Sequence, residues 1–209
     1  MHIILAAGHV ESTGAIFGPE REGADAIIQV DAAAHVLAAH GVSVTVVPHD
    51  LDYVDTVKWI NARYFGQEHL AIEVHKNAGS TTARRVEVYY AAGDIADQQR
   101  AINLAGHLGA ETGLPFMAMP DTATHVGKLY FCRGTLVPAL LVEMNFIEQP
   151  DNEVEMGKQL GRAILKYMGI PIKAEKELEE DMPDIQEKTG MAMRFSGYDG
   201  PIELVDHAG

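Results

Sequence analysis

Apolar side chains recur at steps of three and four residues in several stretches of the chain, and this spacing places them on one face of a helix. The clearest stretch begins at Glu22 and continues to His40, where Gly41 can end the helix. A later stretch ends at Gly113 and Pro115. The pattern predicts helices over residues 22–40, 54–64, 95–111 and 154–168.

Short apolar runs, several of them rich in β-branched residues, lie between these helices and predict strands. Because strands that alternate with helices of ten or more residues are typical of an α/β fold, we expect one domain of that class. It should contain a single twisted, mostly parallel sheet of about six strands with helices on both faces. Strands are predicted over residues 2–6, 42–47, 70–75, 86–90 and 137–144, and a loop with short extended pieces over residues 116–134.

The end of the chain differs in composition from this predicted core. From about residue 172 the sequence becomes acidic in "KAEKELEEDMPDIQEK" and then Gly-rich in "SGYDGPIELVDHAG". We therefore expect residues 1–171 to form the domain and residues 172–209 to form an acidic C-terminal appendage. The appendage is either a solvated tail, a small binding element or an element through which subunits form a homo-oligomer.

The charge balance excludes some classes of partner. The 209 residues carry a formal net charge of −14, with 30 acidic against 16 basic residues. This excess argues against a nucleic-acid surface and against attraction to anionic membranes. No apolar run approaches the roughly 20 residues that span a bilayer, so we expect no membrane insertion. The first residues, "MHIILAAGHV", lack a basic segment and a cleavage site, so we expect no signal peptide.

Four ionisable residues lie where an α/β sheet would place a site. His9 follows the first predicted strand, His75 ends the third, and Glu143 ends the run "PALLVE". Glu22 opens the first predicted helix. Sites in such folds form beyond the carboxyl ends of the strands, so we expect these side chains to converge. Imidazole and carboxylate groups suit a zinc site for metal-assisted hydrolysis, whereas the single Cys132 supplies no Cys-rich site.

The segments around these residues resemble the zinc-dependent N-acetylmuramoyl-L-alanine amidases. The similar segments are "AGHVESTGAIFGPEREGADAIIQVDAAAHVLAAHGVSV", "LAIEVHKNAG", "RVEVYY" and "PALLVEMNFIEQPDN", in the family's order over about residues 2–170. The resemblance implies that His9, Glu22 and His75 are ligands of Zn²⁺. It implies that Glu143 is the catalytic acid and base. The implied substrate is peptidoglycan, cleaved between N-acetylmuramic acid and the L-alanine of the stem peptide.

Two other acids compete with Glu22 for the role of ligand. In the family, about nineteen residues separate the ligand Glu from the Gly that ends its helix. Glu22 lies nineteen residues before Gly41, whereas Glu20 lies twenty-one before it. We therefore prefer Glu22 and keep Glu20 as the alternative, while Glu11 is interpreted as a loop residue.

The chain departs from the family's pattern around the same residues. Val10 follows the first histidine where Gly is usual. Glu73 and Lys76 stand where the family has Ser and Ala around the second histidine. Asn145 replaces Gly in the turn after Glu143. These departures keep all four site residues but bring the shape of the substrate groove into question.

Four further residues have both a structural and a functional interpretation. Asn77 either bonds substrate or turns the loop, and His125 either shapes the groove or only folds its loop. Arg133 either meets an acidic group of the stem peptide or is solvated. Glu87 lies on a predicted strand and is a candidate partner for a site histidine.

For an amidase of this kind, the expected lack of a signal peptide, the compact core and the short appendage favour a phage-type endolysin that waits in the host cytoplasm until it is released to the cell wall. A truncated form of an exported amidase would have the same sequence features. Two other functions stay open. One is a zinc hydrolase of another peptide or poly-glutamate amide, and the other is an inactive amidase-like module that binds the cell wall.

Overall fold

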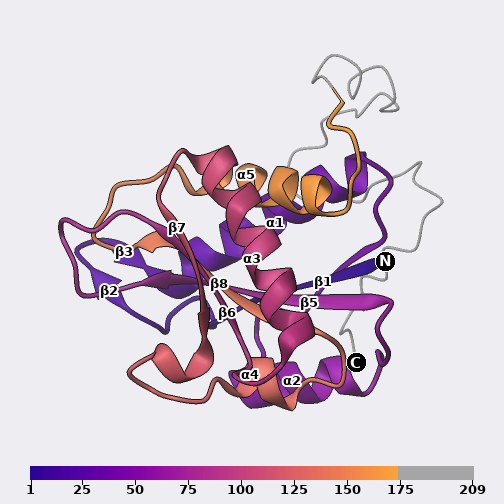
Figure 1. Ribbon diagram of the computed structural model, residues 1–209. Helices are drawn as coiled ribbons and strands as arrows, with labels where there is room; N and C mark the ends of the chain where they lie inside the picture. Colours follow the sequence, from indigo (N-terminus) through magenta and orange to yellow (C-terminus); the bar gives the residue numbers. More distant parts are fainter. Residues whose placement is uncertain (174–209) are drawn as a thin grey trace, which may run out of the picture.

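The computed structural model describes residues 1–173, which form one sheet with helices around it (Figure 1). The order of the six strands across the sheet is β4-β1-β5-β8-β6-β7. All neighbours are parallel except β6 and β8, which are antiparallel. The predicted fold class is therefore confirmed. The strands are β1 (His2–Ala7), β4 (Val44–Val46), β5 (His69–Asn77), β6 (Val86–Tyr90), β7 (Phe116–Pro120) and β8 (Ala139–Phe146).

Helices cover both faces of the sheet, as the apolar periodicity predicts. Figure 1 shows α1 (Glu22–Ala39), α3 (Ile95–Thr112) and α5 (Glu153–Tyr167) on one side, and α2 (Tyr53–Asn61) and α4 (Tyr130–Gly134) on the other. The central strands are buried on both faces, which is why their sequences are continuously apolar. Within residues 1–173, no helix is both long and apolar enough to cross a membrane.

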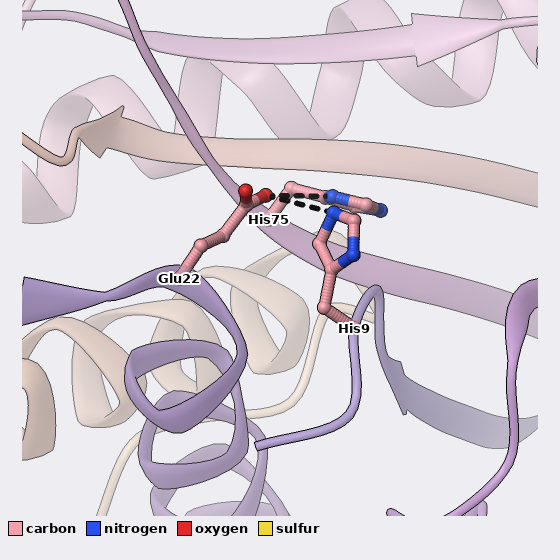
Figure 2. Close-up of side chains that lie close together, drawn as sticks. All are labelled: His9, Glu22 and His75. Carbon is pink, nitrogen blue, oxygen red and sulfur yellow. Dashed lines mark hydrogen bonds and ion pairs between the residues drawn. The ribbon is translucent and has the colours of Figure 1, made fainter. Parts of the chain in front are cut away.

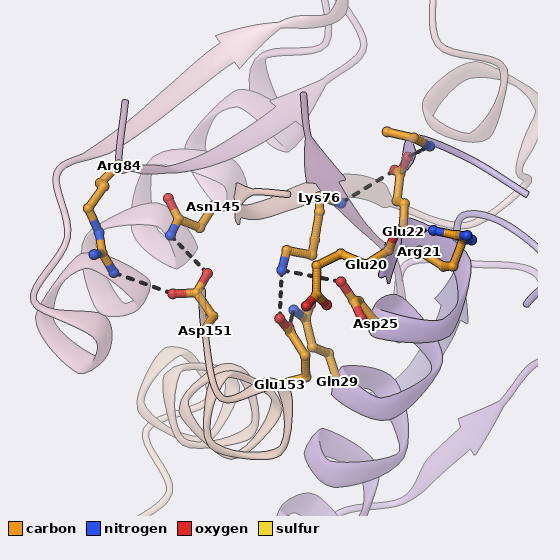
Figure 3. Close-up of polar contacts among 11 residues, drawn as sticks. Glu20, Arg21, Glu22, Asp25, Gln29, Lys76, Arg84, Asn145, Asp151 and Glu153 are labelled. Carbon is orange, nitrogen blue, oxygen red and sulfur yellow. Dashed lines mark hydrogen bonds and ion pairs between the residues drawn. The ribbon is translucent and has the colours of Figure 1, made fainter. Parts of the chain in front are cut away.

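Helices α1 and α5 approach each other closely because α5 presents glycines to its neighbour. A Cβ atom on Gly157 would lie 2.4 Å from the carbonyl oxygen of Gln29, and one on Gly161 would lie 2.7 Å from Cβ of Val36. Any side chain at these positions would push the two helices apart. The close approach brings the first turns of α1 and α5 side by side, beside the end of β5 (Figure 3).

The prediction of a loop with short extended pieces over residues 116–134 is confirmed for one extended piece but missed the helix at the end of the segment. This segment contains β7, a 3-10 turn (Asp121–Ala123) and α4. The strand lies at the edge of the sheet, where Phe116 and Met117 are exposed, so its sequence lacks the alternation of a half-buried strand. A short hairpin of β2 (Ile16–Phe17) and β3 (Glu20–Arg21) also forms inside the first Gly-containing loop.

The proposed appendage lies almost entirely outside the described residues. Its boundary at residues 171 and 172, and its suggested role in a homo-oligomer, therefore stay predictions. The described chain ends shortly after α5, at Lys173, whose backbone N–H donates to Nε2 of His40.

Candidate metal site and catalytic carboxylate

Three predicted site residues meet at the carboxyl edge of the sheet (Figure 2). His9 follows β1, Glu22 is the first residue of α1, and His75 lies near the end of β5. One ligand atom from each of them lies within 4.8 Å of the others. Because β1 and β5 are parallel neighbours, their carboxyl ends bring the two histidines together. Of the competing acids, Glu22 and not Glu20 or Glu11 belongs to this group.

Oxygen Oε1 of Glu22 is the centre of the group. It lies 2.9 Å from Nδ1 of His75 and 3.5 Å from Nε2 of His9. The other oxygen, Oε2, accepts a hydrogen bond of 2.7 Å from the backbone N–H of Ala15. This bond fixes the carboxylate and leaves Oε1 directed at both imidazoles, whose rings cross at 84° with centroids 5.0 Å apart.

Glycines give these side chains their space. A Cβ atom on Gly8 would lie 1.9 Å from Nε2 of His75, so the imidazole lies directly against the backbone that follows β1. Gly14 has a φ of 88°, and a Cβ there would also lie 2.7 Å from Oε2 of Glu22. The tight loop between β1 and β2 therefore requires residues without side chains at both positions.

The charges in the group perturb one another. Burial alone would lower the pKa of His75, but its hydrogen bonds to Glu22 and Glu73 outweigh burial and raise that pKa well above its usual range. Burial opposes ionisation of Glu22, yet the bond to His75 keeps the pKa of Glu22 below its usual value. The pKa of His9 is lowered, chiefly by burial. The contact between His75 and Glu22 therefore shifts the pKa of each residue in the direction that favours its charged form.

Two imidazoles and one carboxylate fit a divalent metal ion. They match the three protein ligands of a catalytic zinc site, which leaves one position open. The carboxylate of Glu22 is almost fully buried, with 7% of its side chain exposed. A buried negative charge is costly unless it is paired, and a divalent cation between the three residues would pair with it. His9 is the most accessible of the three, with 34% of its side chain exposed, so the site opens on that side.

Glu143 lies next to this group, on β8, directly beside His75 in the parallel register. Burial is the main cause that raises its pKa to about 7, and the carboxylates of Glu22, Glu87 and Glu73 add to the effect. Its Oε2 has no hydrogen-bond partner among residues 1–173. A carboxyl group with a pKa near neutrality can both accept and donate a proton in the working range of an enzyme.

A cavity of about 270 Å³ opens beside Glu143. Asn77 and His125 line it, as two of the functional interpretations require. The amide of Asn77 also donates a 2.9 Å hydrogen bond to Oε2 of Glu87. Apolar side chains complete the wall, so a substrate held here would contact both polar and apolar groups. They are Met119, Val126, Leu129 and Leu141.

Three other candidate residues from the sequence are engaged in contacts that stabilise the fold and do not reach the metal site. The guanidinium of Arg133 bonds to both oxygens of Asp121, which is fully buried, and Arg133 does not line the cavity beside Glu143. Glu87 accepts bonds from Asn77, Arg85 and Tyr89, and it is not a partner of either site histidine. Cys132 is buried, and burial raises the pKa of its thiol, so it is not a reactive thiolate.

The sequence departures around His75 have partners that the sequence did not reveal (Figure 3). Lys76 has a fully buried side chain, and its Nζ lies 2.6 Å from Glu153 of α5 and 3.3 Å from Asp25 of α1. Glu73 lies with Oε2 3.2 Å from Nε2 of His75. In the sequence, the only sign of these contacts of Lys76 and Glu73 was a long polar residue inside an apolar run.

Asn145 has a backbone φ of 93°, a conformation that favours glycine. Its side chain compensates with two hydrogen bonds. Nδ2 donates to Oδ2 of Asp151 at 2.9 Å, and Oδ1 accepts from the backbone N–H of Arg85 at 3.2 Å. The replacement of Gly by Asn thus keeps the turn that follows Glu143.

Comparison with known proteins agrees with this geometry. The family model described as N-acetylmuramoyl-L-alanine amidase matches residues 3–166. A comparison with curated protein sequences finds no significant match.

Several solved structures have the same fold at low sequence identity. The catalytic domain of CwlV, an N-acetylmuramoyl-L-alanine amidase from Bacillus (Paenibacillus) polymyxa var. colistinus, has a TM-score of 0.65 at 17% identity, covering 82% of this chain and 100% of that one. The catalytic domain of the CD27L endolysin targeting Clostridia difficile has a TM-score of 0.63 at 19% identity, covering 83% and 99%. AmiC2 of Nostoc punctiforme, another N-acetylmuramoyl-L-alanine amidase, has a TM-score of 0.62 at 15% identity, covering 80% and 97%.

Proposed function

This chain belongs to the N-acetylmuramoyl-L-alanine amidase family, and on that premise we propose that it is a zinc-dependent peptidoglycan hydrolase. It cleaves the amide between N-acetylmuramic acid and the L-alanine of the stem peptide. His9, Glu22 and His75 hold the zinc ion, and Glu143 transfers the proton. The observation that carries the proposal is the convergence of three ligand atoms within 4.8 Å beside a buried carboxyl group on the next strand.

The arrangement assigns a separate task to each part of the site. Zinc, when bound, supplies a Lewis acid that polarises the amide carbonyl and lowers the pKa of water. Glu143 accepts a proton from the attacking water and delivers it to the departing amine of L-alanine. Its pKa of about 7 suits both transfers. The cavity beside Glu143 gives the substrate a place next to that carboxyl group.

The proposal is tested by replacing Glu143 and following metal binding and cleavage separately. Glu143→Ala should keep zinc at wild-type stoichiometry and abolish release of peptides from purified peptidoglycan. Mass spectrometry of the wild-type digest should show intact stem peptides with a free L-alanine amino group. Full residual cleavage by the variant would contradict the role of Glu143, and a different new amino end would identify another amide substrate.

We further propose that the enzyme is a phage-type endolysin that stays in the host cytoplasm until it reaches the wall. The likeness to the CD27L endolysin catalytic domain supports this setting. Expression in a susceptible bacterium should leave the culture turbid until the membrane is permeabilised, and lysis should then follow. Lysis without permeabilisation would contradict the proposal. The inactive Glu143→Ala variant provides the control.

A further inference from the structure

The two ring nitrogens of His75 have different surroundings. Nδ1 lies 2.9 Å from Oε1 of Glu22, the oxygen that also lies 3.5 Å from Nε2 of His9. This is the side on which the three ligand atoms converge. Nε2, at the other edge of the ring, lies 3.2 Å from Oε2 of Glu73. The two carboxylates therefore lie at opposite nitrogens of one imidazole.

Glu73 makes few contacts that would explain its burial. It precedes His75 by two residues on β5, so both side chains project from the same face of the strand. The residue is 3% exposed, and no Lys or Arg among residues 1–173 forms an ion pair with it. Its Oε1 has no hydrogen-bond partner within the described chain. Burying a carboxylate with so few partners costs free energy, so Glu73 does not owe its place to stability.

We propose that Glu73 is a positioning residue for the metal ligand His75, an inference that rests on the zinc site proposed above. Glu73 accepts a hydrogen bond from Nε2–H. A neutral imidazole has one ring proton, so fixing that proton on Nε2 leaves the lone pair of Nδ1 directed at Glu22 and His9. A carboxylate at the outer nitrogen also makes the ligand nitrogen more basic. The related motif has Ser here, so this carboxylate distinguishes the present chain.

The backbone holds the imidazole in this orientation. Gly8 lies against the ring so closely that a Cβ atom there would be 1.9 Å from Nε2 and 2.0 Å from Cε1. The side chain of His75 is only 14% exposed. With one face of the ring against Gly8, Glu73 is the hydrogen-bond acceptor at Nε2 within residues 1–173.

The test compares zinc affinity with stability in two variants of the full chain. Zinc dissociation constants are measured by competition with a chromophoric chelator. Glu73→Met removes the acceptor and should weaken zinc binding about 10- to 100-fold, the usual effect of losing such a partner. Glu73→Gln keeps an acceptor oxygen and should lose less. Glu73→Met should lower the stability of the metal-free protein in urea much less than it lowers zinc affinity, because Glu22 remains as a carboxylate partner of His75.

A second measurement and a matched control complete the test. Nitrogen-15 NMR of the zinc-loaded wild type should show His75 protonated at Nε2. Asp97→Asn replaces a carboxylate that is equally buried at the start of α3, and it should leave zinc affinity unchanged.

Three results would reject the inference. They are wild-type zinc affinity in Glu73→Met, zinc affinity and stability falling in parallel in that variant, and a proton at Nδ1 of His75. Failure of wild type to bind zinc would instead refute the proposed metal function itself.

Discussion

His75 is enclosed by groups from three other parts of the chain and by one residue of its own strand. Glu22 and Glu73 lie at its two nitrogens, Gly8 lies against its ring, and Glu143 is its neighbour on β8. The ring therefore has little freedom to turn, and its Nδ1 is held toward Glu22, as the proposed metal site requires. Such preorganisation reduces the free energy that ordering the site would otherwise cost.

Gly8→Ala should damage the metal site directly. The new Cβ would overlap the imidazole of His75, which is buried and must move. We expect zinc affinity to fall at least about 10-fold and the free energy of unfolding to fall by about 1–3 kcal/mol. Gly106→Ala is the control, because a Cβ at this position in α3 meets nothing within 4 Å. Its zinc affinity should equal that of wild type. Wild-type zinc binding by Gly8→Ala would show that the ring is not held by this contact.

Glu143 should make the metal-free protein less stable as the pH rises. Its pKa is about 7 in the folded protein against an ordinary 4.5, so the folded state binds this proton more tightly than the unfolded state does. The loss of folding free energy caused by ionising Glu143 is absent below pH 4.5 and reaches roughly 3 kcal/mol above pH 7. Glu143→Gln should therefore raise the free energy of unfolding by up to about that amount at alkaline pH and change it little in acid.

Urea unfolding of the metal-free proteins across this pH range measures the effect. Glu68→Gln is the control for the loss of a carboxylate, because that side chain is 67% exposed. If the difference in free energy of unfolding between Glu143→Gln and wild type does not grow with pH, the raised pKa of Glu143 is contradicted.

At the scale of elements, a buried ion-pair cluster joins the end of β5 to the first turns of α1 and α5 (Figure 3). Lys76 contributes the cation, and Asp25 and Glu153 contribute the carboxylates. Gln29 of α1 also donates to Glu153. The cluster thus connects the strand that carries His75 with the helix that opens at Glu22, so the relative position of two proposed ligands depends on it.

Lys76→Met should therefore lower the free energy of unfolding strongly. The substitution keeps an unbranched side chain of similar length but leaves Asp25 and Glu153 as buried carboxylates without their cation. Breaking such a buried pair from one side costs roughly 3–5 kcal/mol. Arg162→Met removes partly exposed ion pairs with Glu111 of α3 and Glu155 of α5 and should cost about 1 kcal/mol of folding free energy. Chemical unfolding measures the free energy of unfolding of both variants. Equal decreases in the two would mean that the Lys76 cluster contributes no more to stability than a surface ion pair.

At the scale of the whole molecule, the strand order determines which residues meet. Strands β1, β5 and β8 are neighbours in the middle of the sheet, although their sequences lie far apart. Their carboxyl ends place His9, His75 and Glu143 together, and the return of the chain through a hairpin brings Glu22 to the same edge.

Zinc should stabilise the folded chain as a whole, because the three ligands come together only in the native state. At a zinc concentration 100-fold above the dissociation constant, we expect about 2.7 kcal/mol of added stability. Thermal unfolding with zinc and with a chelator measures this difference. His75→Ala should show the same transition in both conditions, and a zinc-dependent shift that persists in this variant would exclude His75 as a ligand.

The sequence by itself determined the fold class, most of the helices and strands, and a candidate set of four site residues. Local periodicity is sufficient for those elements because it records which face of each one is buried. The edge strand β7 was predicted only as a short extended piece within a loop, because it is exposed and depends on pairing with β6. The sequence favoured Glu22 over Glu20 by its spacing to Gly41, and the tertiary structure groups Glu22 with His9 and His75 because the β2–β3 hairpin returns the chain there.

The same reason applies to Glu73 and Lys76. In the sequence they are two charged residues inside an apolar strand, and their partners lie on other elements or at a ring nitrogen whose direction the sequence does not record. Contacts between distant segments depend on strand order and helix packing rather than on local pattern. The tertiary structure alone therefore shows Lys76 as the link between β5, α1 and α5, and it alone shows that Nε2 of His75 is turned toward Glu73.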